Sequence, residues 1–344
     1  MLRLGIVGCG RVTTMFHLKA VREVEEVAVV AVADRNRARM EKVKGEAGAL
    51  RGYVDHRELL SDPEVEAVVI NTPPRFHEEM AVDALRAGKH VLCEKPLAQS
   101  AEGCLRVKRV QEETGLVVLP GHNYAFTPSL ERAEEVIRGG GVGEVRRVSV
   151  RFENNLRSYG ARSDFRLKTE FGIVEDILPH ILSVTSGVAG EAEEVREVDG
   201  WRERHDVVDN LNLLLRTGDG VSLDCSMSWT KLIPCFRVNI VGTSALIEMD
   251  LMRNPYSLSL ESGGRRRRIG ERRGLKLYWD LLRFKHPSFQ RQYRHLHGLV
   301  EGAEAPRFTV DDEIGMVRMV EEVVRRLSET NLSKPQEYYP ERSG

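Results

Sequence analysis

The chain has 344 residues, with 51 Lys and Arg residues against 52 Asp and Glu residues. At roughly 150 residues per domain, this length suggests about two domains. A content of 41% hydrophobic and 30% charged residues is typical of a folded protein and excludes wholesale disorder. The formal net charge of −1 gives no general attraction to nucleic acid or to an anionic membrane, so we expect a small-molecule substrate and neither of those partners.

Membrane and secretion signals are absent from the sequence. No apolar stretch approaches the roughly 20 residues needed to span a bilayer. Residues 1–4 lead directly into a strand-like segment, so we expect no signal peptide. The five cysteines are odd in number and form no CxxC pair, which argues against a disulfide framework or structural zinc. These features predict a cytoplasmic protein with reduced thiols.

Residues 2–122 repeat a short β-branched strand, a turn and a helical segment. The expected strands are Arg3–Val7, Val27–Ala33, Ala67–Asn71, His90–Cys93 and Leu116–Leu119, and the expected helices lie near Thr13–Val24, Arg37–Gly45, Arg75–Ala87 and Ala101–Thr114. Gly88 and Gly115 are placed to end two of these helices in the left-handed conformation. The alternation predicts an α/β fold with a parallel sheet and helices on both faces, which binds ligands at the carboxyl ends of its strands.

The first expected strand leads into a glycine-containing loop, Gly8-Cys9-Gly10-Arg11-Val12-Thr13. The two glycines allow a tight turn and close backbone approach to a pyrophosphate at the N-terminus of the next helix. Thr13 occupies the place of the usual third glycine, where it either loosens the contact between helix and strand or adds a hydroxyl near the phosphates. We expect Gly8, Gly10, Arg11 and Val12 to bind a dinucleotide, the alternative being an ordinary βαβ turn.

The second expected strand leads to Asp34, where a carboxylate would accept hydrogen bonds from the adenosine ribose. Its charge repels a 2′-phosphate and favours NAD. Arg35, Arg37 and Arg39 follow, and an arginine here can instead bind a 2′-phosphate or stack on adenine. We therefore expect NAD as the cofactor, with NADP as the alternative, and Asp34 and Arg35 among the residues that bind it.

Two later segments carry a family resemblance. Asn71-Thr72-Pro73-Pro74-Arg75-Phe76-His77 is followed by the run Ala84–Leu97, which contains Glu94-Lys95-Pro96. With the opening motif and His17-Leu18, these segments resemble the Gfo/Idh/MocA family of glucose–fructose oxidoreductase, inositol dehydrogenase and rhizopine-catabolism proteins. The resemblance covers nearly the whole chain and is weakest over residues 263–289.

The resemblance implies a Rossmann dinucleotide-binding domain over residues 1–122 and an α/β domain over residues 123–344 with an open, largely antiparallel sheet. It implies that substrate binds between that sheet and the nicotinamide, and that the other face of the sheet joins copies into a homodimer or homotetramer. The sequence agrees, because strand-like runs at 145–155, 206–217, 220–229 and 236–242 are joined by glycine turns and followed by helical patterns at Gln290–Glu301 and Val310–Glu329.

The resemblance assigns catalysis to three residues. Lys95 matches a family lysine that hydrogen-bonds the substrate hydroxyl and the nicotinamide ribose, and that often precedes a cis proline. Asp176-Ile177-Leu178-Pro179-His180 resembles the family's D-x-x-x-H pair. The i, i+4 spacing puts Asp176 and His180 on one helix face, although Pro179 is tolerable only if the helix begins or kinks there. His180 would remove the hydroxyl proton, with Asp176 orienting the ring and Lys95 stabilising the oxygen.

Further site residues are expected on loops. The cofactor set is completed by Thr72, Pro73, His77, Glu94 and Lys95. Substrate contacts are expected from Lys95, Tyr124, Arg157, Arg162, Asp176 and His180, with Tyr159 and Arg166 on the same loop as the two arginines. The cluster Arg265–Arg268, with Arg272 and Arg273, is either a clamp for an anionic substrate or a solvated hairpin or oligomer contact. His205, His286, His295 and His297 show no metal-ligand spacing, so we expect surface or packing roles for them and no bound metal.

The favoured function is an NAD(P)-dependent oxidoreductase that transfers a hydride between the nicotinamide and a secondary alcohol or ketone of a sugar, cyclitol or sugar derivative, nucleotide sugars included. Two alternatives remain at this point: a non-catalytic dinucleotide-binding regulatory protein, and an NAD-dependent glycosidase of the same family. The joint presence of Lys95, Asp176 and His180 favours the enzyme.

Overall fold

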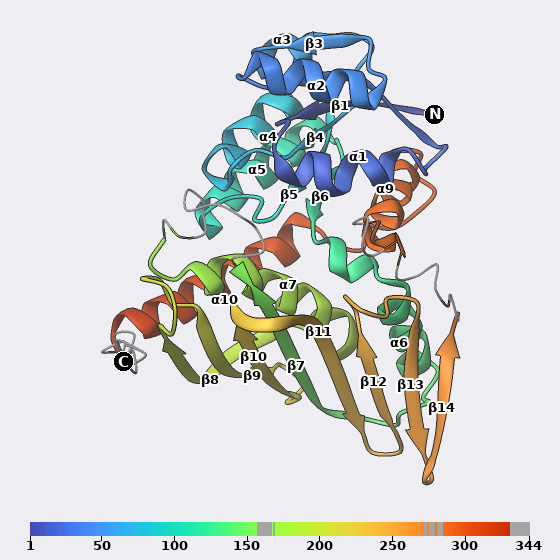
Figure 1. The fold of residues 1–344 in the computed structure, drawn as a ribbon, viewed down its shortest axis with the longest axis vertical. Coiled ribbons are helices and arrows are strands. Elements are labelled where there is room, and N and C mark those ends of the chain that lie inside the picture. Colours follow the sequence, from blue (N-terminus) through green and yellow to red (C-terminus); the bar gives the residue numbers. More distant parts are fainter. Residues whose placement is uncertain (157–166, 168, 272–273, 275–278, 281–284, 331–344) are drawn as a thin grey trace, which may run out of the picture. The chain divides into compact units, whose positions relative to one another are not determined.

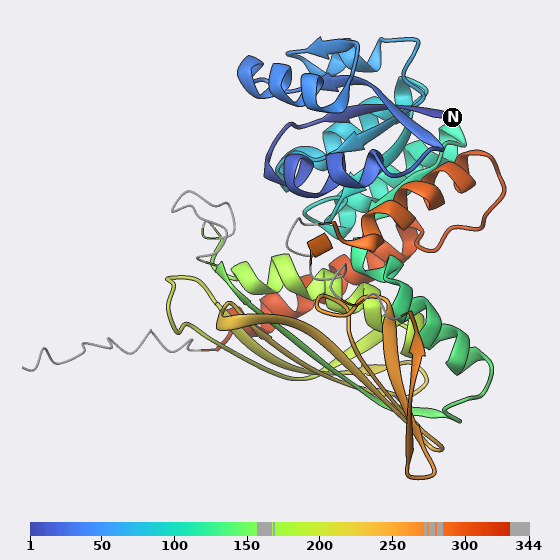
Figure 2. The same cartoon turned by 45° about the vertical axis from the view of Figure 1, so that its right-hand side comes forward.

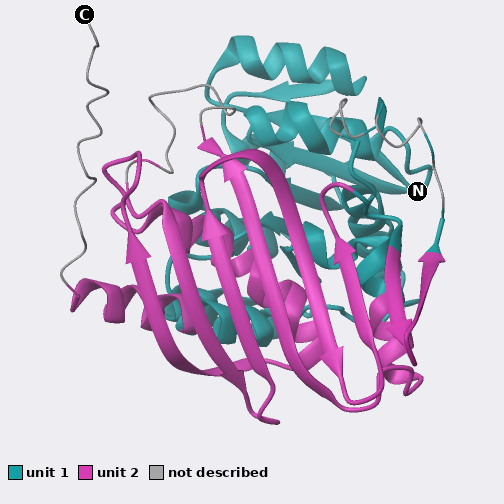
Figure 3. Ribbon diagram, turned by 60° about the horizontal axis from the view of Figure 1, so that its bottom comes forward, with its two compact units in different colours: residues 1–132, 254–257, 270–318 teal, residues 133–253, 258–269, 319–344 magenta. Residues whose placement is uncertain are grey.

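The computed structural model describes residues 1–156, 167, 169–271, 274, 279–280 and 285–330. The chain divides into two compact units, coloured in Figure 3. Unit 1 comprises Met1–Arg132, Asn254–Ser257 and Gly270–Arg318. Unit 2 comprises Ala133–Arg253, Leu258–Ile269 and, among the described residues, the chain from Met319 onward. Unit 1 therefore combines the first third of the chain with segments from its last third.

Unit 1 is built on a six-stranded sheet in the order β3-β2-β1-β4-β5-β6, with every neighbouring pair parallel (Figure 1). The strands are β1 (Leu2–Val7), β2 (Val27–Ala33), β3 (Arg51–Tyr53), β4 (Ala67–Ile70), β5 (His90–Glu94) and β6 (Val118–Gly121). The helices are η1 (Thr13–His17), α1 (Leu18–Val21), α2 (Arg37–Ala47), α3 (His56–Leu60), η2 (Pro74–Phe76), α4 (His77–Arg86), α5 (Ala101–Thr114), η3 (Asn123–Phe126) and α9 (Pro287–Val300). The strand order reverses between β1 and β4, which is the place where doubly wound sheets bind ligands.

The expected elements of the first third are confirmed to within a few residues. The expected helix near Thr13 is a π-helical turn, η1, followed by α1. Gly88 and Gly115 have φ values of 76° and 68°, so the left-handed helix ends are also confirmed. Strand β3 and helix α3 were not expected, because three and five residues are too few to show a hydrophobic period.

The core of unit 1 joins residues that are distant in the sequence. All four residues of β4 are buried, as in a parallel sheet covered on both faces. Val310, Ile314 and Val317 belong to the same buried cluster as Ala84 of α4 and Val107 of α5. These three residues lie in α10 (Val310–Ser328), whose first half belongs to unit 1. The N-terminal sheet is therefore packed partly by the C-terminal helix.

Unit 2 is built on an eight-stranded sheet in the order β14-β13-β12-β11-β7-β10-β9-β8 (Figures 1 and 2). The strands are β7 (Val145–Asn155), β8 (Ala192–Trp201), β9 (Asn210–Thr217), β10 (Ser222–Ser228), β11 (Thr230–Gly242), β12 (Leu246–Asp250), β13 (Ser257–Ser262) and β14 (Arg265–Gly270), and the helices are α6 (Pro128–Arg138), which begins in unit 1, and α7 (Gly172–Ala189). β7 and β10 pair in parallel, whereas the other pairs with a resolved register are antiparallel. The expected open, largely antiparallel sheet is confirmed.

One face of the unit 2 sheet packs against α7, which contacts β7, β9 and β10. On these strands, buried residues alternate with exposed polar ones such as Arg151, Arg216 and Asp224. This alternation is the mark of an antiparallel sheet with one covered and one open face. Leu232 and Ile233, at an irregularity in β11, are 81% and 64% exposed.

The arginine cluster lies on the hairpin between β13 and β14, whose turn is formed by Gly263 and Gly264 at positive φ. Arg265–Arg268 are exposed, and Arg266 pairs with Glu248. These four arginines thus lie exposed on a hairpin, whereas Arg272 and Arg273 lie outside the described part of the chain. Among the described residues, no helix combines the length and hydropathy that crossing a membrane requires.

Candidate active site

The loop after β1 is shaped to receive a phosphate-bearing ligand. Gly8 has φ +97°, and a Cβ built there would lie 2.7 Å from the carbonyl oxygen of Asn71. Only glycine therefore fits at this position. At Gly10 a Cβ would meet nothing within 4 Å, so the backbone has open space beside it. This is the space that a pyrophosphate occupies when it approaches a dinucleotide-binding loop.

Thr13 stands where this loop usually carries its third glycine, and its hydroxyl is used inside the protein. The Thr13 Oγ1 donates to the carbonyl oxygen of Gly8 at 2.6 Å and accepts from the side-chain amide of Asn71 at 3.0 Å. Neither of the two roles expected for Thr13 included these internal hydrogen bonds. The side chain is buried and ties the loop to the end of β4.

Asp34, at the end of β2, is held as a carboxylate. It accepts hydrogen bonds from the backbone N–H groups of Cys9 and Asn36 at 2.9 Å and 2.7 Å, and from the guanidinium of Arg39 at 3.0 Å. Burial is the largest influence on its pKa and acts to raise it, but these donors outweigh burial and the pKa is lowered. An ionised acceptor at this position suits the hydroxyls of an adenosine ribose.

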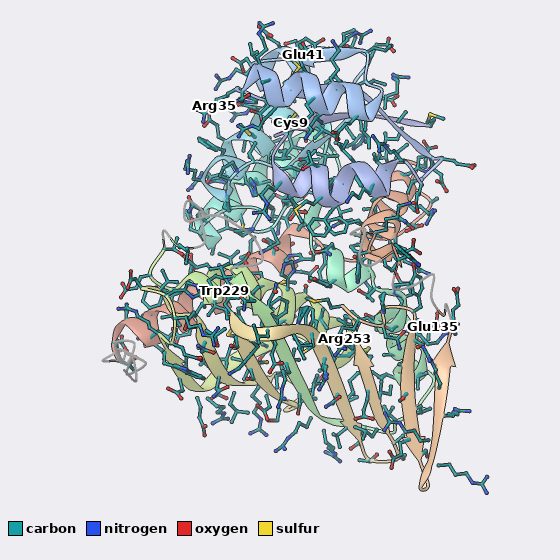
Figure 4. The ribbon with its side chains drawn as sticks, in the orientation of Figure 1. Cys9, Arg35, Glu41, Glu135, Trp229 and Arg253 are labelled. Atoms are coloured by element: carbon teal, nitrogen blue, oxygen red, sulfur yellow. The ribbon has the colours of Figure 1, made fainter. Side chains whose placement is uncertain are left out.

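The residues beside Asp34 differ in their surroundings. Arg35 is exposed (Figure 4). Its guanidinium lies 5.7 Å from the centre of the Phe76 ring, and that of Arg75 lies 4.5 Å from the same ring centre. Such cation–π pairs provide a flat surface suited to an adenine base. Cys9, in the loop after β1, is buried. Burial raises the pKa of its thiol to about 12, so the thiol stays protonated.

The loop after β5 carries Lys95. The Lys95–Pro96 peptide bond is cis, as the family pattern implies. The loop runs close to β6, where a Cβ at Gly121 would lie 2.7 Å from the Cys93 carbonyl oxygen and from the Glu94 Cα. Lys95 is half-buried at the carboxyl end of the sheet, the edge at which parallel sheets bind ligands.

Buried side chains from distant parts of the sequence hold this loop. His17 Nε2 lies 3.0 Å from Glu94 Oε1, and its Nδ1 lies 2.8 Å from the hydroxyl of Tyr293. On the other side of Lys95, Glu313 accepts from the backbone N–H of Leu97 at 2.9 Å and is paired with His122. Tyr293, His122 and Glu313 were missed in the sequence, because no local motif marks a residue whose partner lies about 190 or more positions away.

Both carboxylates beside Lys95 are ionised despite their burial. Burial is the largest influence on the pKa of Glu94 and of Glu313 and acts to raise both. The hydrogen bond and charge of His17 reverse this for Glu94, and the charge and hydrogen bond of His122 do so for Glu313, so both pKa values are lowered. The Lys95 ammonium also contributes to each shift. Lys95 therefore lies within the field of two fixed negative charges.

The Asp176 and His180 side chains lie on α7 in unit 2. This helix begins at Gly172 and continues to Ala189, so of the two alternatives for Pro179, a helix start or a kink, the helix start is wrong. The proline costs one helical hydrogen bond, but the remaining turns and the apolar packing of α7 maintain the helix. Asp176 and His180 are half-buried and one turn apart on the same face. Lys95, in contrast, belongs to unit 1.

The start of α7 is anchored by the loop between β8 and β9. The backbone N–H of Ile173 bonds the Val208 carbonyl, and the N–H of Val208 bonds the Glu170 carbonyl. Next to this attachment, the fully buried Asp209 accepts from three consecutive backbone N–H groups, those of Glu203, Arg204 and His205, and from the His205 ring. The carboxylate thereby shapes the loop that anchors the start of α7.

Replacing Asp209 with asparagine is expected to lower the free energy of unfolding by about 2–3 kcal/mol at pH 7, since it removes charge-assisted hydrogen bonds from a buried site. Burial acts to raise the pKa of Asp209, but His205 and the N–H donors lower it overall. A carboxylate whose pKa is lower in the folded state stabilises the fold fully above its unfolded-state pKa, which is near 4. This stabilisation is lost as the pH falls through the folded-state pKa. The difference from wild type in urea unfolding should therefore shrink below about pH 4. Asp224→Asn, on the exposed face of β10, is the control, and a pH-independent difference would contradict the assignment.

The remaining expected residues have varied environments. Tyr124 is half-buried in unit 1, where its ring lies 5.5 Å from that of His286 in an edge-on contact. His286 caps α9, His205 pairs with Asp209 and His295 pairs with Glu304, so the packing roles expected for these histidines are confirmed. Arg157, Tyr159, Arg162 and Arg166 lie outside the described residues.

Two family models match the chain. The model described as "Oxidoreductase family, NAD-binding Rossmann fold" matches residues 2–122, and the model described as "GFO/IDH/MocA C-terminal domain" matches residues 130–248. The chain belongs to the Gfo/Idh/MocA family. The Rossmann domain of this family member is thus an NAD-binding one, and the family resemblance seen in the sequence is confirmed.

Among curated relatives, the family member is 31% identical over 232 residues to 1-carboxy-3-chloro-3,4-dihydroxycyclohexa-1,5-diene dehydrogenase of Comamonas testosteroni, covering 66% of this chain and 58% of that protein. It is 28% identical over 199 residues to myo-inositol 2-dehydrogenase of Thermotoga maritima, covering 58% of each. The matched part thus spans less than two thirds of these relatives. The solved structure of a 3-ketoreductase from Actinomadura kijaniata with NADP and TDP-benzene shares the fold, with TM-score 0.79, 22% identity and coverage of 94% and 97% of the two chains.

Proposed function

We propose that this protein is an NAD(P)-dependent oxidoreductase that transfers a hydride between the nicotinamide and a secondary alcohol or ketone on a ring substrate, such as a cyclitol, a sugar or a sugar derivative. The anchored Lys95 at the ligand edge of an NAD-binding sheet is the observation that carries this proposal. The names of the two curated relatives support it, because both describe a dehydrogenase acting on a hydroxylated six-membered ring.

The proposed roles follow from the chemistry of the side chains. His180 accepts the hydroxyl proton, and Asp176 orients the ring and stabilises its cation. Lys95 donates a hydrogen bond to the same substrate oxygen and stabilises its developing negative charge. Bound NAD supplies the hydride acceptor. The residues proposed to hold the dinucleotide are Gly8, Gly10, Arg11, Val12, Asp34, Arg35, Thr72, Pro73, Glu94 and Lys95. His77, expected in the same set, is 1% exposed and bonds the Thr72 carbonyl, so it would act through that loop.

A substrate panel tests this function. Myo-inositol, scyllo-inositol, aldoses, linear polyols and nucleotide sugars are each supplied with NAD and NADP, and reduced cofactor is followed by its absorbance. We expect turnover of at least one cyclic polyol. Cofactor binding without turnover of any compound would favour the regulatory alternative, and release of a leaving group without net reduction would favour the glycosidase.

Cofactor preference is expected to depend on the Asp34–Arg39 pair. Asp34→Ala should weaken NADH binding about 10-fold through the loss of ribose hydrogen bonds. It also frees the Arg39 guanidinium, now 3.0 Å from Asp34, to bind a 2′-phosphate. The ratio of NADPH to NADH affinity, measured by fluorescence titration, should therefore rise. In Asp34→Ala/Arg39→Ala the gain for NADPH should disappear, and an unchanged ratio in both variants would refute this role.

We also propose that copies of the chain associate through the open face of the unit 2 sheet. Leu232 and Ile233, exposed at an irregularity in β11 of this sheet, support the proposal, because exposed large apolar side chains commonly mark interaction surfaces.

A further inference from the structure

His77 makes an unusual pair of hydrogen bonds. It begins α4 and is 1% exposed. Its Nδ1 lies 2.7 Å from the carbonyl oxygen of Pro96, and its Nε2 lies 2.7 Å from the carbonyl oxygen of Thr72. Carbonyl oxygens only accept hydrogen bonds, so both ring nitrogens must donate. A neutral imidazole carries one N–H and an imidazolium carries two. Both bonds therefore form together only when the ring is protonated.

A buried cation requires a counter-charge. Glu94 supplies one, because its carboxylate interacts electrostatically with His77 as well as with Lys95. Glu94 is itself fixed by His17, whose other nitrogen is bonded to Tyr293. Burial raises the pKa of the Tyr293 hydroxyl far above its usual range, so the phenol beside His17 Nδ1 stays protonated. Burial acts to raise the pKa of Glu94, but the hydrogen bond and the charge of His17 lower it and keep this carboxylate negative.

Two further charged residues, Glu78 and Lys95, bear on this arrangement. Glu78, the next residue of α4, forms an ion pair with Arg106 of α5. Lys95, which shares the field of Glu94, lies one residue before Pro96 in the sequence. The cation His77 thus bonds the carbonyl oxygen of Pro96, the residue after Lys95. The anion Glu94 is the residue before Lys95.

We propose that His77 is a positioning residue for Lys95. The His77 ring is an imidazolium at pH 7 and connects the Thr72 loop to the Lys95–Pro96 loop. Loss of one proton would leave a nitrogen lone pair facing a carbonyl oxygen at 2.7 Å, which is repulsive. The proton thereby couples a loop proposed to bind cofactor to the loop that aims the lysine. The role in positioning rests on the proposed function of Lys95, whereas the charge of His77 does not.

The charge state is tested by nitrogen NMR of protein labelled with ¹⁵N-histidine at pH 7. We expect a ring signal in which both nitrogens resonate as protonated and which is lost in His77→Gln. A neutral tautomer for His77 overturns the proposal. If His77→Gln does not fold, the wild-type spectrum still decides, because absence of any doubly protonated ring at pH 7 among the ten histidines also overturns it.

The positioning role is tested by steady-state kinetics with the best substrate from the panel. We expect His77→Gln to lower kcat about 10-fold with the substrate KM changed less than about 3-fold. His56→Gln is the matched control, because His56 is a half-buried histidine of unit 1 whose partners are Asp55 and Asp83. An imidazolium with unchanged kcat in His77→Gln overturns the positioning role. Absence of turnover in the wild type speaks against the proposed function alone and leaves the NMR result valid.

Discussion

Replacing Lys95 with alanine is expected to lower kcat at least ~100-fold, because the substrate oxygen loses its charged hydrogen-bond donor in the transition state. The dissociation constant for NADH should change less than about 3-fold, since the glycine loop and Asp34 remain. His180→Ala should lower kcat to a similar extent through loss of the proton acceptor. Stopped-flow absorbance and NADH fluorescence measure the two effects separately.

Two controls accompany these variants. Lys95→Arg retains the positive charge in a larger, planar group and should stay well below wild-type turnover, because geometry as well as charge is required. Lys108→Ala removes a lysine of α5 that pairs with Asp311 and should leave kcat unchanged. Near-normal turnover in both Lys95→Ala and His180→Ala would refute the assignment of the catalytic groups.

Replacing Gly8 with alanine is expected to destabilise the protein by about 2–4 kcal/mol, because the new Cβ would lie 2.7 Å from a backbone oxygen at a positive φ. Gly10→Ala is the matched comparison. Its Cβ meets no protein atom within 4 Å, so stability should change by less than about 1 kcal/mol. Urea unfolding measures both values.

The two glycine variants should separate folding from ligand binding. Gly10→Ala places a methyl group in the space proposed for the pyrophosphate, so NADH affinity should fall about 10-fold or more although the protein remains stable. Equal loss of stability in both variants would show that the open space at Gly10 is not a ligand site. Unchanged NADH binding in Gly10→Ala would lead to the same conclusion.

Much of unit 1 could be predicted from the sequence because its signals are local. The strand Val27–Ala33 is a continuous apolar run and has the same bounds in the structure. The helix Ala101–Thr114 was also predicted with its bounds, since Ser100 caps its start and Gly115 ends it. Lys95 and the Asp176–His180 pair were found through sequence motifs, and their joint action in one reaction stays a proposal.

The support of the candidate site could not be predicted, because it depends on non-local packing. Glu313 and Tyr293 are ordinary residues of amphipathic helices when judged by sequence, and only the tertiary fold brings them to the Lys95 loop. Strand β8 was missed because acidic residues interrupt its apolar pattern. The role of Thr13 was also missed, because the partners of its hydroxyl, Gly8 and Asn71, come together only in the folded loop.

The bond between Glu313 and the backbone of Leu97 limits how this protein can be divided. A gene fragment that encodes only the first 122 residues would retain every strand of the parallel sheet but would lose Tyr293, Glu313 and the apolar residues of α10 that complete its core. The dinucleotide-binding sheet is therefore not an interchangeable module. Recombination that exchanges the C-terminal half between relatives would have to replace these partners together with the Lys95 loop for the chimera to keep its lysine in place.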